Sequence, residues 1–208
     1  LSIRRQRQMC IRDRFIAGAA DYTICYYRQD FGRLNADKDS YGVPRSKSIQ
    51  TTPAHQLALA AVYYSPLQYM YWYDKPSDSQ DEPELKFFDD VYTTWDDTKV
   101  LQGEVGEFIT IARRKGEEWF IGSITNNEKR VLSVSLDFLP EGKNYIAEIY
   151  TDGDKSVKTR TKVRVSTYRV SNKTKLNFCL KASGGGAVRL VPDDGNIKSV
   201  KNYKQQRL

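Results

Sequence analysis

Downstream of Trp95, apolar and polar residues alternate with a period of two. This alternation is typical of β-strands that bury one face. Polar or glycine-containing stretches interrupt it at short intervals. The expected strands are 99–104, 107–113, 118–125, 130–136, 145–150, 163–170, 175–180 and 187–190. Eight short strands at this spacing predict an antiparallel β-sandwich that holds its own core and folds without the residues before it.

Short sequences rich in Gly, Asn and Asp separate these strands, and these residue types tolerate the backbone conformations of tight turns. The turn sequences are Lys115-Gly116, Asn126-Asn127, Glu141-Gly142, Asp152-Gly153 and Gly184-Gly185-Gly186. We expect Asp152-Gly153-Asp154 to be a simple hairpin turn, because two carboxylates beside a glycine are common in such turns. We expect the three glycines to form a loop before the last strand.

The first part of the chain has a different pattern. Residues 15–27 begin as a small apolar run that Asp21 interrupts, which predicts a buried strand ending in a polar loop. Thr52 followed by Pro53 is a helix start, with a capping hydroxyl and proline at the first helical position. Residues 55–64 are apolar almost all round, so this helix must be buried on most sides. Ser65-Pro66 should break or kink it.

Two polar stretches suggest how the chain divides. Residues 74–83 are rich in Asp, Ser, Pro and Glu and mark the expected domain boundary. A short amphipathic helix follows at 84–88. The tail from Asp193 is polar, and we expect residues 193–208 to be disordered.

The net charge of +7 suggests a nucleic-acid partner until its distribution is considered. Residues 1–14 hold five arginines and one aspartate, and residues 193–208 hold four basic and two acidic residues. The stretch between them therefore carries only +1. A nucleic-acid-binding domain would place its basic residues on a folded face, so we expect no nucleic-acid partner.

Residues 1–14 lack the apolar stretch and cleavage site of a signal peptide. Residues 7–14 resemble a translated sequencing adaptor, so we expect 1–14 to be a non-native leader; a disordered basic arm is the alternative. No apolar run approaches the roughly 20 residues of a membrane helix. The cysteines outside the leader, Cys25 and Cys179, show no metal-ligand spacing and are expected to be buried or half-buried thiols.

Several blocks of sequence, in order, resemble glycoside hydrolase family 97. These blocks are Gly18–Thr23, Ala54–Leu59, Val62–Gln68, Trp95–Leu101, Ile111–Arg114, Gly122–Asn126 and Gly184–Arg189. The resemblance implies a parent with an N-terminal β-sandwich, a central catalytic (β/α)8 barrel and a C-terminal β-sandwich. Residues 15–91 would be the end of the barrel, and residues 92–192 would be the C-terminal β-sandwich.

The same resemblance implies the chemistry of the parent, an exo-acting α-glycosidase that hydrolyses terminal α-linked glucose or galactose in an oligosaccharide. Such enzymes use two carboxyl groups. The family places these groups, and the glutamates that bind calcium, upstream of Gly18–Thr23, so we expect no catalytic and no metal-binding residue in this chain. The family also implies a periplasmic location and a homo-oligomer formed through the C-terminal domain.

Asp21 and Tyr22 are the candidate substrate-binding residues. Asp21 is expected at a strand end, where barrel enzymes place their functional side chains. It could cap a loop at the rim of the pocket, bind a sugar directly or, least in keeping with the family, act as a catalytic carboxylate. Tyr22 could stack on a sugar or pack beneath the loop.

Other residues have a structural and a functional interpretation. His55, the only histidine, is expected to make a structural hydrogen bond rather than to bind a metal. The aromatic cluster could be a carbohydrate platform, but its spacing favours a core between two domains; it comprises Tyr63, Tyr64, Tyr69, Tyr71, Trp72 and Tyr73. The spacing of Asn35, Asp37 and Asp39 resembles a calcium loop but lacks its glycine and closing glutamate.

Two functions remain open for the sandwich itself. A carbohydrate-binding module would expose tryptophans on one sheet face, whereas we expect Trp95 and Trp119 to point inward, Trp95 as a buried anchor between the two domains. An interaction module that stabilises the barrel or an oligomer fits better, so we expect the chain itself to be inactive and structural.

Overall fold

All eight strands expected downstream of Trp95 are present in the computed structural model, which describes residues 22–26, 51–72, 82–196 and 199–204. They are β3 Asp97–Glu104, β4 Phe108–Lys115, β5 Glu118–Thr125, β6 Arg130–Ser135, β7 Asn144–Asp152, β8 Val163–Ser171, β9 Lys175–Leu180 and β10 Gly185–Pro192. Six of them form an antiparallel sheet in the order β3-β4-β5-β10-β7-β8, and β6 pairs with β9 in a second sheet. The prediction of an antiparallel sandwich is confirmed.

The core of the sandwich lies between these two sheets. Alternate residues of each strand point into it, as the period of two requires. From the large sheet come residues such as Ile121 and Val188, and from the small sheet Val134 and Phe178, all 1% exposed or less. Trp119 also points into this core and is 4% exposed, as expected.

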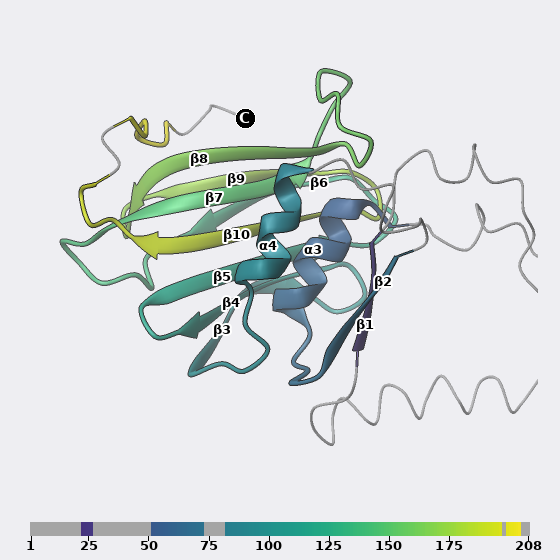
Figure 1. The fold of residues 1–208 in the computed structure, drawn as a ribbon, viewed down its shortest axis with the longest axis horizontal. Coiled ribbons are helices and arrows are strands. Elements are labelled where there is room, and N and C mark those ends of the chain that lie inside the picture. Colours follow the sequence, from purple (N-terminus) through teal and green to yellow (C-terminus); the bar gives the residue numbers. More distant parts are fainter. Residues whose placement is uncertain (1–21, 27–50, 73–81, 197–198, 205–208) are drawn as a thin grey trace, which may run out of the picture.

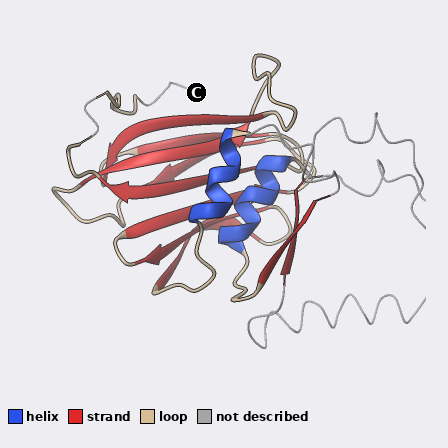
Figure 2. Ribbon diagram, viewed as in Figure 1, coloured by secondary structure: helices blue, strands red, loops and turns tan. Residues whose placement is uncertain are grey.

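A helical layer covers the opposite face of the six-stranded sheet (Figures 1 and 2). It consists of α3 Pro53–Val62, a 3-10 turn at Pro83–Leu85 and α4 Lys86–Asp90. Together with the outer face of the sheet these helices form a second apolar cluster, in which Leu57 and Phe87 pack with Phe120 and Tyr150. The predicted helix start is confirmed, because Thr52 caps α3 and Pro53 occupies its first turn.

The molecule therefore has three layers, and both faces of the large sheet are covered at its centre. Nine of the ten α3 residues are buried, which explains why that segment is apolar on almost every side. The helix ends at Val62, before the Ser65-Pro66 pair at which we expected a break or a kink. Trp95 is half-buried rather than buried, with its ring 5.5 Å from that of Phe120.

The glycine-rich stretch 184–186 is not the loop that we expected, because Gly185 and Gly186 are buried residues of β10. Their lack of a side chain serves close packing: a Cβ on Gly185 would lie 2.5 Å from Cα of His55 in α3. Gly122 in β5 has the same role, since its Cβ would lie 2.5 Å from the carbonyl oxygen of Ala58. Both glycines let α3 lie directly against the sheet.

Asp152-Gly153-Asp154 is not a simple hairpin turn either. β7 and β8 are paired neighbours, but ten residues, 153–162, connect them. The Asp152 carboxylate accepts hydrogen bonds from the backbone N–H groups of Lys181 and Gly185 at 3.0 and 3.2 Å. It thus stabilises the turn between β9 and β10, a long-range role that a local pattern does not reveal.

The segment around Asp21 also differs from our expectation. Asp21 lies outside the described residues, and Tyr22 belongs to strand β1 Tyr22–Tyr26 rather than to a polar loop. β1 pairs in parallel with β2 Gln68–Trp72, and α3 lies between them in sequence. Ile24 is 3% exposed because it packs into the cluster of the helical layer.

We expected the whole C-terminal tail to be disordered, but part of it has a defined structure. Within residues 199–204, Asn202 bridges to Arg169 at the edge of β8, and the Tyr203 ring packs edge-to-face on Tyr168 at 5.3 Å. The Tyr203 hydroxyl accepts a hydrogen bond from the backbone N–H of Asn177 in β9. These contacts give an otherwise polar segment a fixed place.

Two burial predictions are also wrong. Cys179 is exposed because it lies on the outward face of β9, where its neighbours Phe178 and Leu180 point inward. Tyr64 and Tyr69 of the aromatic cluster are 46% and 54% exposed, so they are not part of a core within the described residues. The side chains of Tyr71, Trp72 and Tyr73, the leader, residues 35–39 and most of the expected linker lie outside the described residues.

Candidate functional site

The described residues do not show which polar groups surround the two predicted substrate-binding residues. Asp21 is outside the described residues, and of Tyr22 only the strand position is described, opposite Gln68 of β2. Their contact with a sugar therefore stays a prediction. Two other places bring several polar residues together: the interface between the helical layer and the large sheet, and a groove on the other side of that sheet.

Arg113 joins α3 to the large sheet. Its side chain comes from β4 and is 5% exposed, yet no carboxylate pairs with it among the described residues. Its guanidinium donates instead to the carbonyl oxygens of Ala61 and Val62, at 2.5 and 3.0 Å, and to the Thr98 hydroxyl at 2.9 Å. These carbonyls are left free at the end of α3, where the helix dipole favours a positive charge. Burial lowers the pKa of Arg113.

His55 joins the opposite end of α3 to the sheet. Its backbone N–H is capped by Thr52, and its Nδ1 donates to the carbonyl oxygen of Gly184 at 3.0 Å. The prediction of a structural hydrogen bond is confirmed. Burial lowers the pKa of His55, and the Gly184 carbonyl and Asp152 only partly oppose this effect.

The pKa of His55 predicts how stability depends on pH. Because the folded-state pKa lies below the ordinary value of about 6.5, protonation favours the unfolded chain. The stabilising contribution of His55 should be complete above pH 6.5 and should disappear as the pH falls through the folded-state pKa. The melting temperature of the natural chain should exceed that of His55→Gln most at pH 8, and the gap should shrink by pH 5. A gap independent of pH would show that His55 does not titrate as proposed.

α4 is held to the sheet by a network of charges around Arg189 of β10. Its guanidinium contacts Asp90 of α4 at 2.7 Å and Glu118 of β5 at 2.8 Å. Lys86, one turn before Asp90, contacts Glu148 of β7 at 2.8 Å. Burial alone would lower the pKa of Arg189, but the neighbouring carboxylates raise it. Such a network fixes the orientation of α4 more than an isolated surface pair would.

Most sequence blocks that suggested the family meet at this interface. Ala54–Leu59 lies in α3, Ile111–Arg114 supplies Arg113, Gly122–Asn126 supplies the glycine beneath the helix, and Gly184–Arg189 supplies both Gly185 and Arg189. These residues act by close approach, capping and charge pairing. These four blocks therefore attach the helical layer to the sheet.

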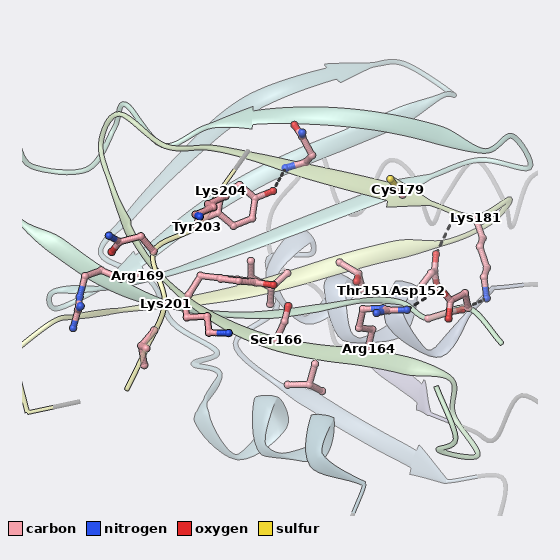
Figure 3. A pocket seen from close by; sticks show the side chains of 18 residues that line it. Thr151, Asp152, Arg164, Ser166, Arg169, Cys179, Lys181, Lys201, Tyr203 and Lys204 are labelled. Carbon is pink, nitrogen blue, oxygen red and sulfur yellow. Dashed lines mark hydrogen bonds and ion pairs between the residues drawn. The ribbon is translucent and has the colours of Figure 1, made fainter. Parts of the chain in front are cut away.

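The groove lies on the inner face of the large sheet, where the two-stranded sheet leaves β7 and β8 uncovered (Figure 3). Its volume is about 1170 Å³. Two carboxylates line it, and both are engaged: Asp152 accepts from backbone N–H groups, and Asp154 contacts Ser156 and Arg164. Hydrogen bonds from Ser156, assisted by Arg164, lower the pKa of Asp154. The lowered pKa of Asp154 does not suit it to act as a general acid, which requires a raised pKa.

The described residues hold no group of three or more His, Cys, Asp or Glu side chains that could bind a metal ion. No helix among the described residues is long and apolar enough to span a bilayer.

Comparison with known proteins agrees with the resemblance. Residues 94–191 match the family model described as "Glycosyl-hydrolase 97 C-terminal, oligomerisation". The chain is 34% identical over 179 residues to a retaining alpha-galactosidase of Bacteroides thetaiotaomicron, covering 85% of this chain and 26% of that protein. The chain thus spans about a quarter of the length of this relative.

Solved structures give the same result. A family 97 enzyme from a Pseudoalteromonas species, in complex with acarbose, is 37% identical with a TM-score of 0.61, over 68% of this chain and 23% of that one. A beta-arabinopyranosidase is 24% identical with a TM-score of 0.55, over 71% of this chain and 22% of that one, which shows a shared fold alone. The matched domain, the curated relative and the matching structure agree, so residues 94–191 belong to the C-terminal domain of glycoside hydrolase family 97.

Proposed function

We propose that the chain is the C-terminal portion of an exo-acting α-glycosidase that hydrolyses terminal α-linked glucose or galactose. The observation that carries this proposal is the 34% identity to a retaining alpha-galactosidase, which extends over 85% of the chain and so includes residues upstream of the sandwich. The acarbose complex of a family 97 relative supports an α-glucoside as the other substrate class.

Within that parent, residues 15–91 would be the end of a catalytic (β/α)8 barrel and residues 92–192 the C-terminal sandwich. β1 and β2 are parallel and connected through α3, which is the unit from which such barrels are built. The catalytic carboxylates and a calcium site would lie elsewhere in the parent, and its location would be periplasmic, as the family implies.

For the chain itself we propose a structural and oligomerisation role. The matched domain carries that description in its family, and the helical layer ties it to the segment that precedes it. A carbohydrate platform built on tryptophan is less well supported, because Trp119 is 4% exposed and Trp95 packs on Phe120.

Two measurements test this proposal on the purified chain. With p-nitrophenyl α-glucoside and α-galactoside we expect no turnover. By light scattering we expect a mass of at least two copies of the 24.0 kDa chain. Turnover that Asp21→Ala abolishes would contradict the absence of catalytic residues. A monomer at concentrations of about 100 μM, well above the Kd of most stable homodimers, would contradict the oligomerisation role.

A further inference from the structure

The groove beside β7 and β8 has a polar floor where a sandwich would normally be apolar. The inward-facing positions of β8 change along the strand from Val170 and Tyr168, which belong to the core, to Ser166 and Arg164. β7 changes in the same direction, from Ala147 and Ile149 to Thr151. Polar residues on an inward face indicate that this part of the face is in contact with solvent or a ligand.

The walls of the groove are fixed, and its strand edges are already occupied. Backbone hydrogen bonds join Arg169 to Lys201 and Tyr203, which covers part of the β8 edge. On the β9 edge, the N–H of Asn177 donates to the Tyr203 hydroxyl and the N–H of Lys181 to Asp152. A peptide could not add to β9 in register at these two positions, so a ligand would be recognised by side chains.

The groove is basic. Five of its side chains are cationic and two are acidic, which gives a net charge of +3. Arg164 pairs with Asp154, and Arg169 pairs with Asp193 outside the groove. Lys201 and Lys204 are exposed, and neither has an ion pair within the part of the chain that the structure describes. Figure 3 shows Arg164 and Lys181 at one end, Lys201 and Lys204 at the other, and Ser166 between them. This arrangement favours an extended anionic ligand.

The groove is also lined by aliphatic side chains and the Cys179 thiol, and its other polar lining groups are hydroxyls, two amides and the Tyr168–Tyr203 aromatic pair. These are the groups that hydrogen-bond to sugar hydroxyls and pack on sugar rings. The volume of about 1170 Å³ exceeds the usual size of a site for one small molecule. We propose that the groove binds an acidic oligosaccharide, whose carboxylates contact Lys201 and Lys204 and whose rings lie over Ser166 and Tyr203.

Calorimetric titration of the 208-residue chain tests this proposal, with tetragalacturonate as the probe and maltotetraose and tetraglutamate as comparisons. Tetragalacturonate should bind, and the double variant Lys201→Ala/Lys204→Ala should bind it roughly tenfold more weakly, because two exposed ion pairs together contribute about that factor. The matched control, Lys129→Ala/Lys173→Ala, removes two exposed lysines outside the groove and should bind as the natural chain does.

Three results would overturn the proposal. No heat of binding with tetragalacturonate at millimolar concentration would show that the groove is not a site for it. Equal weakening in both double variants would indicate attraction to net charge alone. Tetraglutamate binding as tightly as tetragalacturonate would show that the groove does not recognise sugar. Both double variants should keep the melting temperature of the natural chain, since the exchanged lysines are exposed.

Discussion

Gly122→Ala is expected to lower the melting temperature of the chain by roughly 6 to 12 °C, which corresponds to about 3 kcal/mol for a protein of this size. The added Cβ would lie 2.5 Å from the carbonyl oxygen of Ala58 and 2.8 Å from a methyl group of Val62. A backbone oxygen in a buried helix cannot rotate away as a flexible side chain can. The whole of α3 would have to move off the sheet, which would open the apolar cluster beneath it.

Gly103→Ala is the matched control for this substitution. Gly103 is also a strand glycine, in β3, and its added Cβ would meet nothing nearer than 3.2 Å. Thermal unfolding followed by circular dichroism should therefore show a much smaller change for Gly103→Ala. Equal changes for the two variants would mean that the loss comes from the strand and not from the contact with α3.

Phe87→Ala is expected to cost about 3 to 5 kcal/mol, or roughly 6 to 20 °C in melting temperature. Phe87 comes from α4, is completely buried, and packs edge-to-face on Phe120 and Tyr150 at 6.0 and 5.3 Å. Its removal would leave a cavity between α4 and the sheet. Denaturant unfolding gives the free energy directly, and Phe87→Leu, which keeps most of the volume, should lose much less. A loss below about 1 kcal/mol for Phe87→Ala would show that α4 contributes little to the fold.

The strands could be predicted because their signal is local. Alternation within β9 gave its bounds as the structure has them, since each residue's environment follows from its position in the pleat. β5 is buried on both faces, and its bounds followed from the turn sequences Lys115-Gly116 and Asn126-Asn127 on either side of it. The start of α3 was equally local, because Thr52 and Pro53 act within one helical turn.

The features that sequence reasoning missed depend on partners far away in the chain. Gly185 looks like a turn residue until His55, about 130 positions earlier, is placed against it. Asp152 looks like part of a hairpin turn until Lys181 and Gly185 are seen to donate to its carboxylate. The burial of Arg113 could not be predicted from its strand, which carries two adjacent arginines. Its acceptors are the last carbonyls of a helix that lies far away in the sequence. That the sandwich folds without the residues before it stays a prediction, and the second apolar cluster includes residues of α3 and α4.

Native-state hydrogen exchange tests most directly whether the helical layer and the sandwich are one structural unit. Buried packing on β5 and β10, the Arg113 cap and the Arg189 network all predict that α3 opens only when the sheet opens. The slowest amides of α3 should therefore report the same free energy of opening as those of β5 and β10, to within about 1 kcal/mol. Amides of α3 that exchange several kcal/mol more easily, while the strands stay protected, would show that the helix is an independent attachment and would contradict this view of the fold.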